Sequence, residues 1–166
     1  MIKYIITATI FSLLAIISTF AEEVSQVLVV NVPDTWKVEY KVLDKNLPFY
    51  IIKHKEGNIP SLMFGRSPVP GDGKQIPKQV KKYADEFVAQ ILQNKGFTLK
   101  KVEYEIEQIK GETFSGSFVQ FSIASGITHI MFMISDGSEI WNGRFIGTEE
   151  TWKEALLILT KLKKKD

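Results

Sequence analysis

The sequence predicts an α+β fold in which helices flank both faces of an antiparallel β-sheet. Three observations lead to this prediction. Apolar segments in the second half of the chain are joined by turns so short that neighbouring strands must run antiparallel. The run from Ile130 to Ile134 is apolar at every position, as in a strand covered on both faces. Two helical segments each carry a single apolar stripe, so each can cover one face of a sheet.

The first 21 residues predict an export signal that takes no part in the fold. Lys3 supplies a positive start, Ile5 to Ile17 is uncharged, and Thr19 with Ala21 fits the small-x-small rule for cleavage. We therefore expect cleavage near Ala21 and a single domain over residues 22–166, in the periplasm or secreted. The alternative is a retained membrane anchor, because the uncharged stretch approaches the length that spans a bilayer.

Composition excludes several classes of protein. The chain contains no cysteine, which rules out a lipid-modified cysteine, thiol catalysis and disulfide bonds. The domain must therefore be held together by its core alone, and its length is sufficient for that. The whole chain carries 21 basic and 19 acidic residues, and this near balance argues against a nucleic-acid-binding protein.

The first half of the chain predicts four short strands. Residues 27–32 form an apolar run that ends at Pro33, where a turn is expected. Residues 36–42 alternate apolar and charged side chains, the pattern of a strand with one buried face. Two further apolar segments, residues 49–52 and 61–64, are expected to be strands as well.

A loop and a helix follow these strands. Residues 68–74 are rich in proline and glycine, which forbid a regular element. Residues 77–94 then predict a helix, with Pro77 in the first turn and Gly96 at the stop. The apolar stripe of this helix consists of Ile76, Val80, Ala84, Phe87, Val88, Ile91 and Leu92.

The second half predicts four more strands and a closing helix. The strands are expected at residues 97–109, 113–124, 127–134 and 138–146, with a hairpin turn at Asp136-Gly137 between the last two. The closing helix is expected from Glu149 to Lys163, with Thr148 as its N-cap. Its expected core residues are Trp152, Ala155, Leu156, Leu159 and Leu162.

Lysines gather at the end of the chain, at Lys161, Lys163, Lys164 and Lys165. We expect them to complement the negative end of the closing helix. The alternative is contact with the anionic head groups of a membrane surface.

Short motifs in this chain resemble those of the PsbP-like family. Residues 32–36, Val-Pro-Asp-Thr-Trp, are similar to the Pro-Asp-Gly-Trp entry of many such domains, with Thr35 where glycine is usual. Residues 137–145 and 149–162 resemble the last strand and closing helix of that fold, and the order of elements agrees over residues 27–163. The resemblance implies an α/β/α sandwich, shared with the extrinsic photosystem II protein PsbP, the Mog-type Ran-binding protein and bacterial exported proteins of unknown function.

Members of that family bind other proteins, but their functions differ widely, so the resemblance transfers no binding residue. The residues themselves offer little catalytic chemistry. His54 and His129 are the only histidines, and they are far apart in the sequence. We expect His129 to be a hydrogen-bonded core residue and His54 to lie on the surface. We therefore predict no catalytic residue, no metal site and no cofactor.

The most promising binding residues are Trp141, Asn142 and Arg144, with Arg66 and the following loop as a rim. Tryptophan and arginine are favoured anchors at protein interfaces, although all three tryptophans are first expected to pack in the core. We therefore predict a non-enzymatic, exported, protein-binding module. The alternative function is a carrier of a small molecule or lipid, which requires an apolar cavity between sheet and helix.

Overall fold

The computed structural model describes residues 27–43, 46–69, 73–93, 105–122 and 127–166. The expected signal sequence lies outside these residues, as do positions 97–104 and 123–124 of two expected strands. The elements in chain order are β1 (Leu28–Val29), β2 (Trp36–Leu43), β3 (Leu47–His54), β4 (Ser61–Arg66), α2 (Ile76–Gln93), β5 (Ile106–Lys110), β6 (Ser115–Ser122), β7 (Thr128–Ser135), β8 (Ile140–Gly147), α3 (Glu149–Thr160) and β9 (Lys163–Lys164).

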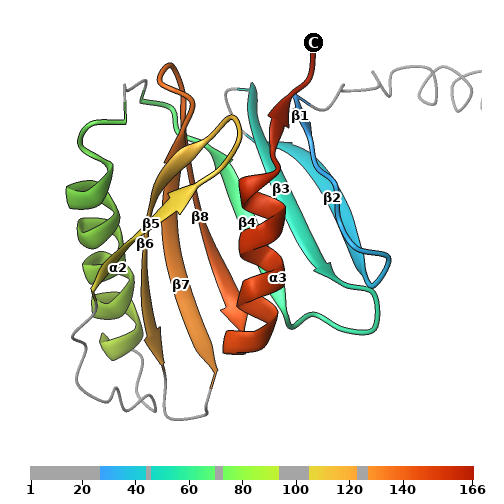
Figure 1. Ribbon diagram of the computed structural model, residues 1–166. Helices are drawn as coiled ribbons and strands as arrows, with labels where there is room; N and C mark the ends of the chain where they lie inside the picture. The colour runs from blue at the N-terminus through green and yellow to red at the C-terminus, as the bar shows by residue number, and fades with distance from the viewer. Residues whose placement is uncertain (1–26, 44–45, 70–72, 94–104, 123–126) are drawn as a thin grey trace, which may run out of the picture.

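The fold is α+β and is built on a seven-stranded antiparallel sheet, as the short turns predicted (Figure 1). The strand order is β2-β3-β4-β8-β7-β6-β5. The chain thus builds one half of the sheet before α2 and the other half after it. The two halves join where β8 pairs with β4, from Ser61 opposite Ile146 to Arg66 opposite Trp141.

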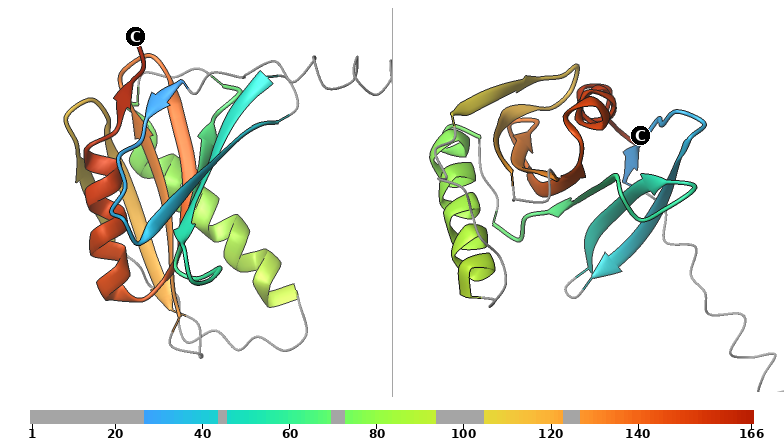
Figure 2. Two further views of the ribbon diagram at one scale, coloured as in Figure 1. Left: turned by 90° about the vertical axis from the view of Figure 1, so that its right-hand side faces the viewer. Right: turned by 90° about the horizontal axis from the view of Figure 1, so that it is seen from below.

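Both helices pack against this sheet. α2 contacts β6 and β7, and α3 contacts β8 and β5. Seen from below, the sheet curves strongly, with α2 beside its β5–β6 end and β2 far from that helix (Figure 2). Among the described residues, no helix combines the length and the apolar character needed to cross a bilayer.

β7 shows how the core is divided. Its side chains alternate between two clusters, because successive residues of a strand point to opposite faces. Ile130, Phe132 and Ile134 belong to the large cluster that includes Trp152 and Leu159 of α3. Met131 belongs to a smaller cluster formed with α2, and Met133 packs against it. β7 therefore contributes to both clusters, and it lies inside the sheet and not at an edge, as predicted for a central strand.

α3 begins as predicted and ends early. Thr148 caps it by accepting a hydrogen bond from the backbone N–H of Thr151, whose side chain in turn accepts one from the N–H of Thr148. The helix ends at Thr160 and not at Lys163. Leu162 is nevertheless buried in the core, because the chain turns back toward β1 directly after the helix.

The expected first strand is also shorter than predicted, and it does not join the main sheet. β1 pairs with β9, Leu28 opposite Lys164 and Val29 opposite Lys163. The buried backbone N–H of Leu28 donates a hydrogen bond of 2.9 Å to the hydroxyl of Tyr50 on β3. This pairing satisfies the backbone of both terminal segments, which explains why residues 163–164 leave the helical path.

Candidate binding groove

The candidate site lies where the sheet extends beyond the strands covered by α2. Two adjoining hollows form here, with volumes of about 510 and 380 Å³. They share Pro68, Tyr83 and Asn142, and we call them together the α2 groove. The groove is bounded by α2 on one side and by residues of β3, β4 and β8 on the other.

The two hollows differ in their lining. The larger one is lined by the loop after β4, by polar residues of α2 and by apolar residues of β7 and β8: Ser67, Pro68, Val69, Gly73, Gln75, Gln79, Lys82, Tyr83, Glu86, Met133, Ile140 and Asn142. The smaller one holds both arginines of the chain among apolar residues: Leu43, Leu47, Pro48, Phe49, Met63, Gly65, Arg66, Pro68, Tyr83, Phe87, Asn142, Gly143 and Arg144.

Strand register explains why Asn142 and Arg144 reach this groove. They alternate along β8 with Trp141 and Phe145, which point into the large core cluster. Arg144 is opposite Met63 on β4 and opposite Met131 on β7. The guanidinium group is therefore flanked by the side chains of Met63 and Met131, which we call the apolar floor of the groove.

Two glycines make room for aromatic rings, one on each face of the sheet. A side chain at Gly65 would place its Cβ 2.8 Å from the Cδ2 of Phe49, so the ring of Phe49 lies against Gly65 and lines the smaller hollow. On the other face of the sheet, a Cβ at Gly143 would lie 2.5 Å from the Cβ of Phe64 and 2.6 Å from Phe132. Both glycines are therefore required by close packing.

The charge of Arg144 lies against aromatic rings. Its guanidinium carbon is 5.6 Å from the centroid of the Phe87 ring on α2, within the range of a cation–π interaction. His129 lies in the same group, with its ring stacked on Phe121 at 5.5 Å and 6.0 Å from Phe87. Burial, and then the positive charge of Arg144, lower the pKa of His129.

Arg66 is placed differently from Arg144. It lines the smaller hollow, but its Nη1 donates a hydrogen bond of 3.1 Å to Oε1 of Glu139. Arg66 also lies directly opposite Trp141 in the sheet register, and so on the opposite face from Asn142 and Arg144. The two guanidinium groups therefore lie on different faces of the sheet, although both residues line the smaller hollow.

Trp141 is not a surface anchor, which corrects its expected binding role. Its side chain is 1% exposed and packs against Tyr50, Phe64 and Phe114 in the large cluster. The prediction that all three tryptophans pack in the core is confirmed, because Trp36 and Trp152 are also buried. The buried Nε1 of Trp141 has no hydrogen-bond partner among the described residues.

The loop after β4 does come close to β8, as the proposed rim requires. The N–H of Ser67 donates a hydrogen bond of 2.8 Å to the carbonyl of Ile140, and Ser67, Pro68, Val69 and Gly73 line the larger hollow beside Asn142. Val69 is 65% exposed, so an apolar side chain stands at the entrance. Residues 70–72 of this loop lie outside the described residues.

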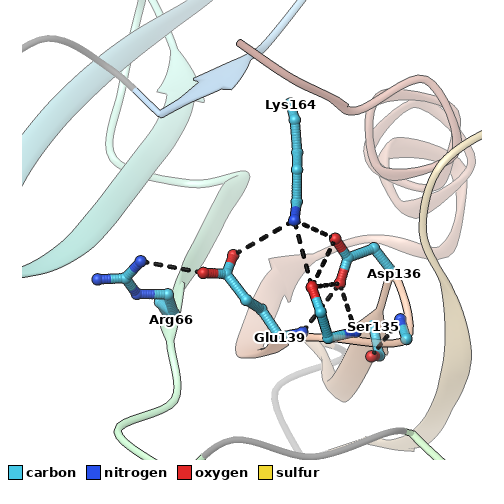
Figure 3. A network of polar contacts seen from close by, with 7 residues as sticks. Arg66, Ser135, Asp136, Glu139 and Lys164 are labelled. Carbon is cyan, nitrogen blue, oxygen red and sulfur yellow. Dashed lines mark hydrogen bonds and ion pairs between the residues drawn. The ribbon is translucent and has the colours of Figure 1, made fainter. Parts of the chain in front are cut away.

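Of the terminal lysines, Lys164 forms ion pairs at the turn of the β7–β8 hairpin (Figure 3). Lys164 contacts Asp136 and lies 4.0 Å from Glu139, which also binds Arg66. Burial raises the pKa of Asp136, but the Lys164 ammonium and the N–H groups of Glu139 and Ser138 hold it well below its usual range. Lys163 pairs with Glu112 at 3.0 Å. α3 ends at Thr160 with Lys161 as its C-cap and no basic residue in its last turn, and Lys163 and Lys164 lie in β9 instead.

The two histidines differ in part from their predictions. Nδ1 of His129 is buried but has no hydrogen-bond partner in the described part of the chain, so its expected hydrogen bond is not seen at that atom. His54, expected on the surface, is partly buried, and its ring is 6.0 Å from that of Trp36. Within the described residues, no group of three His, Cys, Asp or Glu side chains could hold a metal ion.

Several groove residues were not singled out from the sequence. Phe87 was assigned only to the stripe of the helix, and Tyr83, Phe49 and Met63 had no predicted role. Strand alternation offers a signal for Met63, because it lies between Leu62 and Phe64, whose side chains are fully buried on the other face. A methionine at the solvent-facing position of a central strand indicates a surface that is not fully covered.

Comparisons with known proteins find similarity to solved structures, among them one bacterial protein. No family model matches the chain, and no curated protein matches it. The chain is similar to a protein from Bacteroides thetaiotaomicron VPI-5482 whose crystal structure was solved at 1.50 Å resolution. The sequence identity is 12% and the TM-score is 0.41, and the match covers 84% of this chain. The chain spans 45% of the length of that protein.

Proposed function

We propose that this protein is an exported, non-enzymatic module that binds a segment of another polypeptide in the α2 groove. The observation that carries the proposal is the pair of adjoining hollows lined by apolar and aromatic side chains, with an arginine and an amide among them. This composition is typical of binding sites, in which a few polar groups orient an otherwise apolar contact.

The division of the groove into two hollows favours a polypeptide over a compact ligand. Two hollows that share Pro68, Tyr83 and Asn142 can accept two side chains of one extended segment. Asn142 lies at their junction, where its amide can both donate and accept a hydrogen bond with a peptide backbone. Met63 and Met133 supply flexible, polarisable contacts of the kind that adapt to different apolar side chains.

We further propose that the domain is a PsbP-like α/β/α sandwich with its helices on opposite faces of the sheet. The alternation of β7 supports this arrangement, since Phe132 packs in the cluster of α3 and Met131 in the cluster of α2. In such a fold the α2 groove is the part of one face that its helix leaves open.

Site-specific photo-crosslinking in cells that produce the protein tests the binding function. A photoreactive phenylalanine analogue replaces Tyr83 in the groove, and the matched control carries it at Leu157, which is 52% exposed on α3. We expect a protease-sensitive adduct with another polypeptide from position 83 only. Equal adducts from both positions, or none from position 83, would contradict the proposed site.

Export is tested by determining the N-terminus of the protein in the exported fraction. Removal of the leader after Ala21 predicts a chain that begins at Glu22. A chain that begins at Met1 and remains in the cytosol would contradict export, and one that begins at Met1 in the membrane fraction would support the retained anchor.

A carrier of a small apolar molecule remains the second candidate function. The apolar lining of the groove, which lies between a helix and the sheet, is the observation that favours it. Native mass spectrometry of the exported protein distinguishes the two candidates. A retained molecule of a few hundred daltons, lost after substitution of groove residues, would favour the carrier over the polypeptide-binding module.

A further inference from the structure

We infer that the α2 groove selects a partner segment carrying an aspartate or glutamate, whose carboxylate binds Arg144, next to an apolar residue that fills the larger hollow. This inference rests on the proposed function and names the chemistry that the partner must supply.

Arginine usage in the chain points to this role. The sequence has 21 basic residues, of which only Arg66 and Arg144 are arginines, and both line the smaller hollow. The planar guanidinium fork binds a carboxylate through two parallel hydrogen bonds, which a lysine cannot do. The use of arginine at position 144, in a chain whose other basic residues are almost all lysines, therefore favours an anionic ligand in the smaller hollow.

The two arginines differ in whether they are already neutralised. Arg66 is paired with Glu139 at 3.1 Å. Arg144 is partly buried and has no carboxylate within ion-pair distance in the ranges of the chain that the structure describes. Glu86, the acidic residue that lines the larger hollow, pairs instead with Lys82 at 3.8 Å. The groove therefore presents one uncompensated positive charge.

The surroundings of Arg144 strengthen its attraction for an anion. Met63 and Met131 flank it on the neighbouring strands, and the ring of Phe87 lies against its guanidinium group. These apolar neighbours reduce the local dielectric constant, so a carboxylate in the hollow interacts more strongly than at an open surface. The contact with Phe87 also orients the guanidinium plane before a ligand arrives.

The larger hollow supplies the second part of the recognition. Met133, Ile140 and Val69 give it an apolar lining, which suits an aliphatic or aromatic side chain. Asn142 lines both hollows and is two residues from Arg144 on β8, a rise of roughly 7 Å along the strand. An extended segment can therefore place an acidic side chain at Arg144 and, further along its length, an apolar side chain in the larger hollow.

Selection from a phage-displayed library of random linear peptides on the exported protein tests this inference. The library is selected in parallel on the wild type, on Arg144→Gln and on Lys153→Gln, which removes a positive charge from an exposed position of α3. We expect wild type and Lys153→Gln to enrich the same peptides, with an acidic residue near an apolar one. Arg144→Gln should lose that enrichment.

A substitution in the peptide tests the same contact on the wild-type protein, so its result does not depend on whether Arg144→Gln folds correctly. Replacing the acidic residue of an enriched peptide by its amide should weaken binding to the wild type by at least about tenfold, and added salt should weaken the acidic peptide more than the amide. Enriched peptides without an acidic preference, bound equally by Arg144→Gln, would overturn the inference while leaving the proposed function intact. A library that yields no enriched peptide on the wild type would contradict both.

Discussion

The guanidinium group of Arg144 on β8 lies over the ring of Phe87 on α2, with 5.6 Å between its central carbon and the ring centroid. This contact joins the sheet to the helix at the mouth of the smaller hollow. It also places a positive charge next to His129, whose ring is 6.0 Å from the same phenylalanine. Arg144 therefore supplies the charge of the groove. Its side chain also adjoins the aromatic wall, the apolar floor and the open face of the groove.

Arg144→Gln should raise the pKa of His129 toward its ordinary value. Burial is the main cause of the lowered pKa and the Arg144 charge is the second, so the substitution should reverse part of the shift. A lowered pKa means that the folded protein binds the proton more weakly than the unfolded chain, so wild-type stability should fall as the pH drops below about 6.5. NMR titration of the imidazole resonances measures the change, and an unchanged or lower pKa would contradict the assigned contact.

Tyr50→Phe should destabilise the domain by about 1–3 kcal/mol, because the buried N–H of Leu28 loses its acceptor. Tyr40→Phe is the matched control, since Tyr40 lies on the adjacent strand with its ring 5.0 Å from that of Tyr50. We expect the control to change the free energy of unfolding by less than about 0.5 kcal/mol. Urea unfolding measures both values, and equal values would show that the hydroxyl does not hold β1.

Leu159→Ala should reduce the free energy of unfolding by about 2–5 kcal/mol, because a fully buried side chain of α3 is replaced by a cavity. Leu157→Ala on the same helix is the control, as Leu157 is 52% exposed and should contribute little. Thermal unfolding followed by circular dichroism compares the two variants. A larger effect at Leu157 would mean that α3 presents a different face to the core.

Asp136→Ala should destabilise the domain by about 1–3 kcal/mol at neutral pH, because the carboxylate accepts backbone hydrogen bonds from Ser138 and Glu139 and pairs with Lys164. Asp136→Asn keeps one acceptor oxygen and should have a smaller effect.

The pH dependence of Asp136 has a defined sign. Its pKa is lower in the folded protein than in the unfolded chain, so its contribution is complete above about pH 4 and is lost as the pH falls. The difference in unfolding free energy between wild type and Asp136→Asn should therefore shrink under acidic conditions. A difference that stays constant would show that the ion pair does not form in solution.

Much of the fold could be predicted, because the local sequence patterns favour the same elements as the packing of the whole chain. The helix expected at 77–94 is observed as α2 at Ile76–Gln93, since its apolar stripe meets the sheet. The Asp136-Gly137 turn joins β7 and β8, and Gly137 has the positive φ of 93° that favours glycine. In each case the local sequence pattern and the position in the fold agree.

The β1–β9 pair could not be predicted, because nothing local favours it. Lys163 and Lys164 have low strand propensity, and their conformation depends on partners far away in the sequence, Leu28 and Val29 in the ladder and Asp136 beside Lys164. Residues 161–165 alone are compatible with one more turn of α3.

The candidate site could be predicted in part. The sequence pointed to residues 141–144 and to the loop after Arg66, and the structure brings Asn142 and Arg144 together with the described part of that loop. Trp141 was wrongly grouped with them, although alternation along a strand already places it on the opposite face from Asn142. The wall formed by Tyr83 and Phe87 depends on where α2 lies on the sheet, which strand and helix patterns do not specify.

The central claim is that the α2 groove binds a polypeptide segment. Chemical-shift mapping with a peptide enriched from the library tests this claim most directly. The isotope-labelled exported protein is titrated with that peptide, and the backbone amide signals are followed by NMR. Binding in the α2 groove predicts that the largest changes fall on Tyr83, Asn142 and Arg144, with little change at β1 and β9. The largest changes at β1 and β9, or on the exposed side of α3, would contradict it.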